Sequence, residues 1–294
     1  MPTIGLHKVY SGKVREMYEV SDDYLLMVAS DRISAFDVVL DQPIPDKGRV
    51  LTGLSAYWFE QTADLVANHF ISADPTDLPS TAGPDVAGRA MLVRAARPVP
   101  MECVVRGYLF GSAYSEYQES GTVNGVPMAE GLVQAQQLPE PIFTPTTKAT
   151  SGHDQPLHPE AAVDLVGQQR YDQLRDTSIA LYRFGALAAS MRGILLADTK
   201  LEFGEVGDQL MLIDELLTPD SSRFWSAEEY REGTSPPSFD KQFVRAHLLS
   251  VGYQGEGQAP SLPDEVVDGT RSRYVEAYEQ LTETSFADWH GGGE

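Results

Sequence analysis

The sequence contains 294 residues, of which 42% are hydrophobic, and this is enough for one large or two ordinary domains with a buried core. A formal net charge of −21 argues against a protein that binds nucleic acid by neutralising phosphates. The single cysteine, Cys103, excludes a disulfide framework and a thiolate metal site. No apolar run approaches the ~20 residues that span a bilayer, and the N-terminus has no signal-peptide core, so a cytoplasmic protein without a membrane partner is expected.

The N-terminal region has the pattern of antiparallel strands. His7–Val20 is predicted to form two short strands joined by a Ser-Gly turn, and Tyr24–Ala29 is predicted to form a third. In the turn, Gly12 is flanked by Lys13 and Arg15, so the backbone can approach an anion while the side chains supply positive charge. A phosphate-binding loop and an ordinary surface hairpin both explain these residues.

Loops and strands alternate with one helix in the next segment. Ser30–Asp37 (SDRISAFD) directly follows the third strand, where binding loops tend to lie, and it ends in the acid Asp37. Leu51–Asn68 has apolar residues at helical spacing and is predicted to be a core helix. Ala90–Ala96 and Met101–Arg106 are predicted strands, separated by two prolines that break the chain like a hinge.

A second basic region follows in the middle of the chain. Arg106 stands at a strand end, six residues before Ser112, and this pairing of a cation with a hydroxyl suits an anionic ligand. An ion pair between Arg106 and a nearby acid is the alternative. The proline-rich segment from Leu138 to Glu160 is predicted to be a long functional loop without helix. It contains a cluster of four polar residues: Lys148, Ser151, His153 and Asp154.

The C-terminal half is predicted to be richer in helix. Pro159–Arg192 has the apolar spacing of one long helix, and Asp264–Glu283 that of a final amphipathic helix. Another helix begins near Phe239–Arg245, and the glycine-rich tail Phe286–Glu294 is expected to fray.

A hairpin at Ile194–Thr218 places charged side chains in two otherwise apolar strands. Three of them alternate on one face of its first strand: Asp198, Lys200 and Glu202. The second strand, Leu210–Leu217, carries Asp214. A buried, unpaired carboxylate costs several kcal/mol, so these acids need a lysine or a metal ion beside them. If the register brings Asp214 to the face of Glu202, the two carboxylates offer the oxygen ligands that Mg²⁺ prefers, whereas a solvated sheet face is the alternative.

Together these regions resemble the plan of a nucleoside triphosphate site. Triphosphate chemistry needs cations and backbone donors for the phosphates, an apolar slot for the base, and carboxylates for Mg²⁺. The P-loop pattern and the G-x-G-x-x-G fingerprint are both absent from the sequence. The separate basic residues Arg106, Lys148 and Arg223 indicate a second anionic substrate beside the nucleotide.

Two longer motifs stand out in the sequence, Pro100–Ser112 (PMECVVRGYLFGS) and Leu195–Gly204 (LLADTKLEFG). They closely resemble the first and second signatures of the SAICAR synthetase (phosphoribosylaminoimidazole-succinocarboxamide synthase) family of de novo purine biosynthesis. Four further segments are similar to the family: Tyr10–Arg15, Ser30–Asp37, Gly152–Asp154 and Ile213–Trp225. The layout resembles the longer, fungal-like form of the family, which favours a monomer over a homodimer.

The resemblance implies a fold and a reaction. The expected fold is α+β and two-lobed, with an N-terminal antiparallel kinase-like sheet domain at residues 1–96 and a larger α/β domain with C-terminal helices at 97–294. The expected reaction is an ATP-dependent ligation of carboxyaminoimidazole ribonucleotide (CAIR) with L-aspartate, giving SAICAR, ADP and phosphate, with Mg²⁺ as cofactor. An acyl phosphate intermediate is expected, and direct displacement is the alternative. Alternatives are another ATP-dependent small-molecule kinase and an inactive nucleotide-binding protein.

The resemblance also implies roles for individual residues. ATP would be bound by Gly12, Lys13, Val14, Arg15, Val93, Ala95, Glu102, Lys200 and Asp214. Mg²⁺ would be held by Glu202 and Asp214. CAIR and aspartate would be bound by Asp37, Arg106, Ser112, Lys148, Ser151, His153, Asp154, Arg223, Lys241 and Arg245. Lys200, Asp214 and His153 would act in catalysis, His153 as a general base or as a hydrogen-bonding group. Asp198 and Glu215 are expected to be structural.

Overall fold

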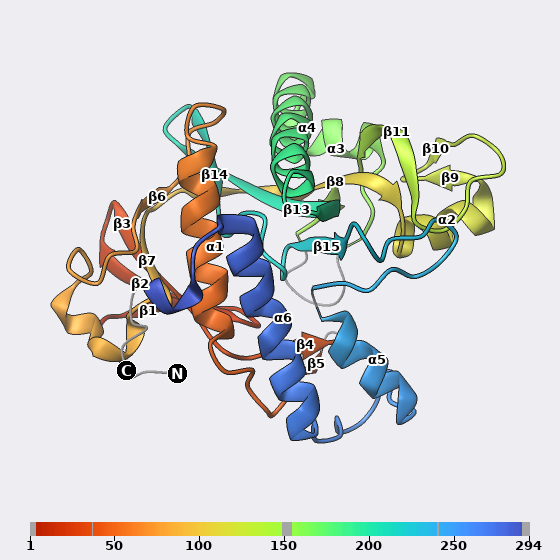
Figure 1. Cartoon of the computed structure of the whole chain (residues 1–294). Helices are drawn as coiled ribbons and strands as arrows, with labels where there is room; N and C mark the ends of the chain where they lie inside the picture. Colours follow the sequence, from red (N-terminus) through yellow and green to blue (C-terminus); the bar gives the residue numbers. More distant parts are fainter. Residues whose placement is uncertain (1–3, 37, 149–154, 240, 290–294) are drawn as a thin grey trace.

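The computed structural model describes residues 4–36, 38–148, 155–239 and 241–289, and it contains two main antiparallel sheets with helices packed around them (Figure 1). This is the α+β arrangement expected from the sequence. Four of the candidate site residues lie outside the described residues: Asp37, Ser151, His153 and Asp154.

The first sheet is built from the N-terminal hairpins, as predicted. Its strands are β1 (Lys8–Ser11), β2 (Arg15–Ser21), β3 (Tyr24–Ala29), β6 (Phe70–Ser72) and β7 (Ala90–Arg94), in the order β1-β2-β3-β7-β6. Met17 of β2 lies opposite Met27 of β3, so the two side chains share one face of the sheet. That face forms part of the candidate site.

The second sheet is centred on two long strands that pair with each other. Its strands are β8 (Arg97–Leu109), β11 (Gln136–Phe143), β12 (Thr146–Thr147), β13 (Ile194–Val206), β14 (Gln209–Ile213) and β15 (Ser222–Ser226). They follow the order β11-β8-β13-β14, with β12 also paired to β8 and β15 to β13. Short two-stranded ladders are formed by β4 (Ser34–Ala35) with β5 (Val38–Val39), and by β9 (Thr122–Val123) with β10 (Val126–Pro127).

Several sequence-based boundaries are wrong, for identifiable reasons. The prolines at 98 and 100 lie inside β8 instead of breaking it; Pro98 is accommodated beside a register shift in β13, where a missing amide hydrogen is tolerated. The segment from Leu138 to Glu160 is not a plain loop, because it contains most of β11 and all of β12. The expected single helix over Pro159–Arg192 is two helices, interrupted at Gly167, whose φ of 81° ends the first.

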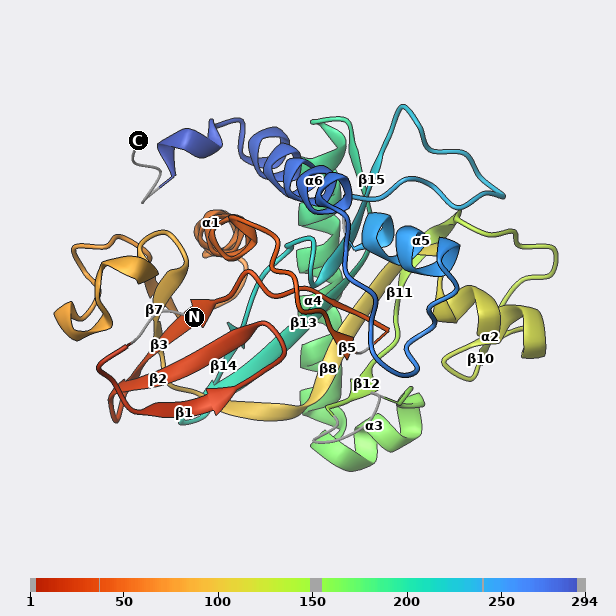
Figure 2. The same ribbon diagram turned by 90° about the horizontal axis from the view of Figure 1, so that it is seen from below.

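The helices are α1 (Lys47–Gln61), α2 (Ser112–Ser120), α3 (Pro159–Val166), α4 (Gln168–Ser190), α5 (Gln242–Ser250) and α6 (Asp264–Thr282), with short 3₁₀ turns at Ser80–Ala82, Pro84–Val86 and Phe286–Asp288. Helix α4 contacts β8 and β13 of the second sheet, and the Tyr182 hydroxyl donates to the Leu196 carbonyl at 2.7 Å. Helices α1 and α6 lie side by side, so the C-terminal helix packs on a helix from the N-terminal third of the chain (Figures 1 and 2).

The chain passes from the first sheet to the second between Arg94 and Arg97. The expected domain limit at residue 96 falls in this connection and stays a prediction. One buried apolar cluster contains side chains of both sheets, including Met27 and Val93 from the first and Leu201 from the second. The two sheets therefore share a core, and the space between them is the natural place for a site.

Candidate active site

A cavity of about 720 Å³ is lined by residues of both sheets. Its charged lining consists of Lys13, Arg15, Arg94, Lys148, Lys200, Lys241, Glu102, Glu202, Asp214, Glu215 and Asp220. Its apolar lining consists of Val14, Met17, Leu25, Met27, Ala96, Pro98 and Ile213. A pocket with an apolar wall and convergent charges can hold a flat ring at one end and an anionic group at the other.

Lys200 of β13 is the central cation of this cavity. Its Nζ donates to Glu102 Oε1 at 2.6 Å and to Glu202 Oε1 at 3.0 Å. Glu102 of β8 lies directly opposite Glu202 in the sheet, so two acids would repel each other here without a shared cation. Lys148 makes a close ion pair with the second oxygen of Glu202. Although burial raises it, Lys200 and Lys148 lower the pKa of Glu202 to about 2, so this carboxylate is ionised at neutral pH.

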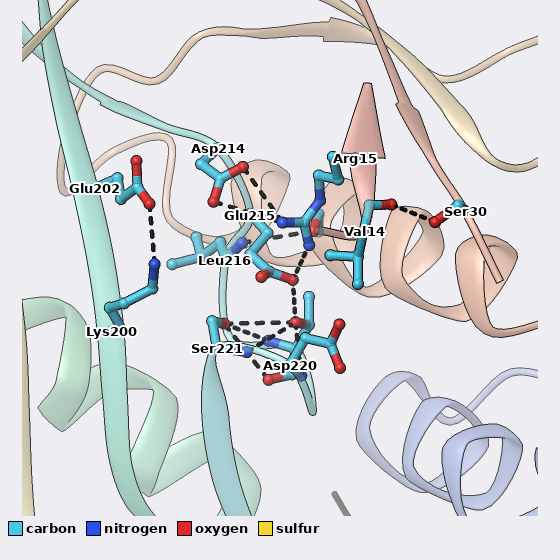
Figure 3. A network of polar contacts seen from close by, with 12 residues as sticks. Val14, Arg15, Ser30, Lys200, Glu202, Asp214, Glu215, Leu216, Asp220 and Ser221 are labelled. Carbon is cyan, nitrogen blue, oxygen red and sulfur yellow. Dashed lines mark hydrogen bonds and ion pairs between the residues drawn. The ribbon is translucent and has the colours of Figure 1, made fainter. Parts of the chain in front are cut away.

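Asp214 reaches the same cavity by leaving its strand. The register places Ile213, not Asp214, opposite Glu202, so an extended chain would direct Asp214 to the other face. Strand β14 ends at Ile213 instead of continuing to Leu217, and Asp214 has a φ of 66°. Its side chain thereby lines the cavity with Glu202 (Figure 3). The expected meeting of the two acids is found, but a backbone turn produces it.

A buried histidine supports this turn. His69 Nε2 lies 3.2 Å from the backbone oxygen of Asp214, and its amide donates to the Leu212 carbonyl at 3.0 Å. Burial lowers the pKa of His69 to about 4, so the ring is neutral at pH 7 and its Nε2–H tautomer donates to Asp214. Burial raises the pKa of the Asp214 carboxyl to about 6, with the nearby Glu202 and Glu215 acting in the same direction and Arg15 opposing it.

Arg15 ties the N-terminal hairpin to the late hairpin. Its guanidinium lies between Asp214, at 3.3 Å from Oδ1, and Glu215, with which it makes a close ion pair (Figure 3). Although burial lowers it, these two acids raise the pKa of Arg15. The Gly12 amide donates to the Arg15 carbonyl at 2.7 Å within the turn, and Gly12 itself lines the cavity. Lys13 and Val14 also line the cavity.

A second, smaller cavity lies beside the first. Its volume is about 160 Å³, and its lining is Asp198, Pro219, Asp220, Ser221, Ser222, Arg223, Lys241 and Arg245. Arg223 makes a close ion pair with Asp198, and Arg106 Nη1 is 3.4 Å from the same carboxylate oxygen. Arg106 Nη2 also donates to the Ser112 hydroxyl at 3.4 Å. Arg106 is therefore ion-paired, as the alternative interpretation expected. Asp198 contacts both Arg106 and Arg223, which are candidates for binding an anion.

Some expected contacts are not brought to the site. Val93 and Ala95 are not among the described residues that line the large cavity, and the neighbouring Arg94 and Ala96 line it instead. Sequence reasoning also missed three residues that lie at or behind its walls: Lys47, His69 and Asp220. Lys47 gave a usable signal, because a lysine that opens a helix opposes the helix dipole and needs a specific partner.

The carboxylates fit a divalent ion that is shared with a ligand. Among the described residues no group of three or more His, Cys, Asp or Glu side chains is arranged to hold a metal. Mg²⁺ is commonly held by one or two carboxylates together with substrate phosphates, so Glu202 and Asp214 suffice. The raised pKa of Asp214 marks a carboxylate that is costly to ionise and would be stabilised by a cation.

A cavity with an apolar wall, several cations and two carboxylates is typical of enzymes that bind phosphate-bearing substrates. The family model described as SAICAR synthetase matches residues 8–262, and the chain belongs to the SAICAR synthetase family. The resemblance of its sequence motifs is thereby confirmed.

Individual relatives support this placement. The chain is 47% identical to a phosphoribosylaminoimidazole-succinocarboxamide synthase of Thermodesulfovibrio yellowstonii over 95% of this chain and 96% of the relative, and 52% identical to one of Salinispora arenicola over 93% and 97%. The structure of SAICAR synthase from Saccharomyces cerevisiae complexed with SAICAR matches with a TM-score of 0.88 and 41% identity, covering 95% and 96% of the two chains. No described helix is long and apolar enough to cross a membrane.

Proposed function

We propose that this chain is an ATP-dependent carbon–nitrogen ligase that condenses CAIR with L-aspartate to give SAICAR, ADP and phosphate. The observation that carries the proposal is the gathering of Lys200, Glu202 and Asp214 at one cavity, beside a second cavity that contains Arg223. A triphosphate and a second phosphate-bearing substrate need two adjoining sites of this kind. The named relatives and the SAICAR complex of the yeast enzyme agree with it.

In the large cavity, the apolar wall is proposed to bind the adenine base of ATP and the cations its phosphates. Met17, Leu25 and Met27 offer a flat apolar surface for adenine, and Lys13 and Arg15 lie at the hairpin where the phosphates are proposed to bind. Glu202 and Asp214 would hold Mg²⁺, which when bound supplies positive charge to the phosphate oxygens. Lys200 is held by Glu102 and Glu202 and presents its ammonium group to the same region.

The smaller cavity is proposed to bind CAIR. Asp198 fixes the guanidinium groups of Arg106 and Arg223, which suits them to bind the phosphate of the ribonucleotide. Lys148 and Lys241, at the boundary of the large cavity, would meet the carboxylates of CAIR and aspartate. Which residues touch aspartate, and the parts of Asp37, Ser151, His153 and Asp154, stay predictions.

The chemistry requires an activated carboxyl group. A carboxylate resists attack by an amine because its oxygen is a poor leaving group, so the terminal phosphoryl group of ATP is proposed to pass to the carboxylate oxygen of CAIR, with ADP leaving. The amine of aspartate then attacks the acyl carbon, loses a proton, and phosphate departs with the electron pair of the broken bond. The side chains of the site contribute positioning and charge neutralisation to these steps.

ADP formation tests this proposal. Purified protein with ATP, Mg²⁺, CAIR and L-aspartate should release ADP and form SAICAR, and leaving out either CAIR or aspartate should stop both. A different ATP-dependent kinase would form ADP with a hydroxyl acceptor and without aspartate. That outcome would overturn the proposed ligase activity. The cytoplasm is the proposed compartment, in keeping with the free, buried thiol of Cys103.

A further inference from the structure

Lys47 is a fully buried cation that none of the proposed roles uses. It opens α1, and its side chain has 0% of its surface exposed. Its Nζ donates to Asp220 Oδ2 at 2.6 Å. Burying a lysine costs several kcal/mol, and replacing both members of such a buried ion pair by neutral side chains of similar volume is often neutral or stabilising. The helix dipole also disfavours a cation at this end of α1. Stability alone therefore gives no reason for a lysine here.

Asp220 stands in the wall that the two cavities share. It lines both the large cavity and the smaller one, and so does Lys241. The other oxygen of Asp220, Oδ1, accepts a hydrogen bond from the Tyr274 hydroxyl at 2.8 Å and lies 3.5 Å from Nζ of Lys241. One carboxylate thus joins α1, α6 and the residue that precedes α5.

The position of Asp220 is unfavourable for a site that binds anions on both sides. Only 3% of its side chain is exposed, so water screens its charge poorly. An uncompensated carboxylate would repel phosphates and carboxylates in both cavities, and it would draw Lys241 toward itself. Lys47 approaches Asp220 from α1 and is not among the described residues lining either cavity. It can cancel the charge without occupying ligand space.

Asp220 lies closer to Lys47 than to Lys241. With Lys47 at 2.6 Å and Lys241 at 3.5 Å, the buried lysine is the closer counter-ion of Asp220, and the ammonium group of Lys241 keeps its exposure to both cavities. We infer that Lys47 is a positioning residue: it neutralises Asp220 from behind the shared wall and thereby leaves Lys241 directed toward anionic ligands. The identity of those ligands, ATP and CAIR, rests on the proposed function.

Two variants test the charge logic. Lys47→Met keeps the approximate volume but removes the closer counter-ion of Asp220 and leaves Lys241, at 3.5 Å, to pair with it. Because Lys241 would then be drawn away from the ligands, we expect the KM values for CAIR and ATP to rise about tenfold or more, with a smaller change in kcat. Lys47→Met combined with Asp220→Asn removes both charges, and KM should return to within about threefold of the wild-type value. A purely structural role predicts a different result: Lys47→Met would have a lowered Tm, but its folded protein would keep the wild-type KM values.

Arg49→Met is the matched control. Arg49 lies on the same helix, is ion-paired with Asp46, and is not among the described residues lining either cavity. Its loss removes the same amount of positive charge, so unchanged KM values are expected. A tenfold rise in this control would show that net charge, not the pairing of Lys47 with Asp220, governs ligand affinity, and would overturn the inference.

Direct titration separates this inference from the proposed function. ATP with Mg²⁺, titrated calorimetrically into each protein without CAIR, should bind the wild type and the double variant with similar affinity and Lys47→Met more weakly. If the wild type makes no SAICAR, the proposed function fails while this titration still tests the inference. If Lys47→Met does not fold, the double variant decides, since its neutral pair should fold and bind as the wild type does. Weak ATP binding by a folded double variant would overturn the role of Lys47.

Discussion

Replacing Glu202 with glutamine tests the core of the proposed site. The change is nearly isosteric, and it removes a full negative charge because Lys200 and Lys148 hold the pKa of Glu202 at about 2. Glutamine cannot serve as an anionic ligand for Mg²⁺, and it leaves Lys200 with Glu102 as its remaining carboxylate partner. We expect kcat to fall by about 10²–10³-fold, the range seen when one preorganised charge-stabilising group is removed.

The fold should tolerate this change. Glu202 has only 9% of its surface exposed, and its bond to Lys200 at 3.0 Å is of the charge-assisted kind, worth about 1.5–3 kcal/mol. The pair with Lys148 contributes less, because 36% of the Lys148 side chain is exposed and water screens it. Since the glutamine amide oxygen still accepts from Lys200, the expected loss is about 1–2 kcal/mol, or a few degrees in Tm.

The assay is ADP release coupled to SAICAR formation at saturating substrates, together with a thermal melt. Glu205→Gln is the control, because Glu205 is a carboxylate of the same strand β13, is ion-paired with Arg97 and Arg170, and is not among the described residues lining the large cavity. This variant should keep full turnover. A Glu202→Gln protein that melts normally and turns over at the wild-type rate would refute the role of Glu202 at the metal.

Three further outcomes are expected. Arg271→Ala should lower Tm by about 1–3 °C at pH 7, because Arg271 Nε donates to Asp46 at 2.9 Å but the Arg271 side chain is 42% exposed. Although burial raises it, Arg271 and Arg49 lower the pKa of Asp46 in the folded protein. The stabilisation is therefore present above the unfolded pKa of about 4, and the difference in Tm should vanish as the melt is repeated toward pH 3. Gly107→Ala should cost about 1–3 kcal/mol in a denaturant titration, because its Cβ would lie 1.8 Å from the Tyr182 hydroxyl oxygen. Light scattering after gel filtration should give the mass of a monomer, about 32.2 kDa; a dimer mass would contradict the expectation from the longer form.

Local sequence patterns were sufficient for the parts of the fold that depend on strand alternation. The N-terminal hairpin, the strand at Tyr24–Ala29 and the face shared by Lys200 and Glu202 follow from period-two spacing, which the backbone enforces wherever a strand is regular. Gly12, Lys13 and Arg15 also lie together in the lining of the large cavity, and their role in phosphate binding stays a prediction. These features are local, so residues that are neighbours in the sequence are sufficient to predict them.

Features that depend on distant partners could not be predicted in this way. The prolines at 98 and 100 read as a break because the register shift that accommodates Pro98 lies in β13, about a hundred residues later. Lys47 and Asp220 are separated by 173 positions, and the sequence around either residue does not indicate that the other is its partner. The apolar spacing over Pro159–Arg192 predicts one helix, but the structure has two, divided at Gly167. Hydrophobic spacing contains no information about the positive φ of Gly167.

In the hairpin at Ile194–Thr218, the two acids that follow the end of β14, Asp214 and Glu215, are placed by an irregular turn. Asp198 and Glu202 lie within β13 and face cations from their own sheet, Arg106 and Lys200. Asp214 reaches the cavity only because the chain turns at φ 66°, and the turn leaves Glu215 paired with Arg15 of the other sheet. The irregular end of β14 therefore brings two acids to a cation from the first sheet. Because Arg15 contacts both acids, a shift of the N-terminal hairpin relative to β14 would alter the charge around Asp214. Such a shift would couple the proposed phosphate site at that hairpin to the proposed metal site.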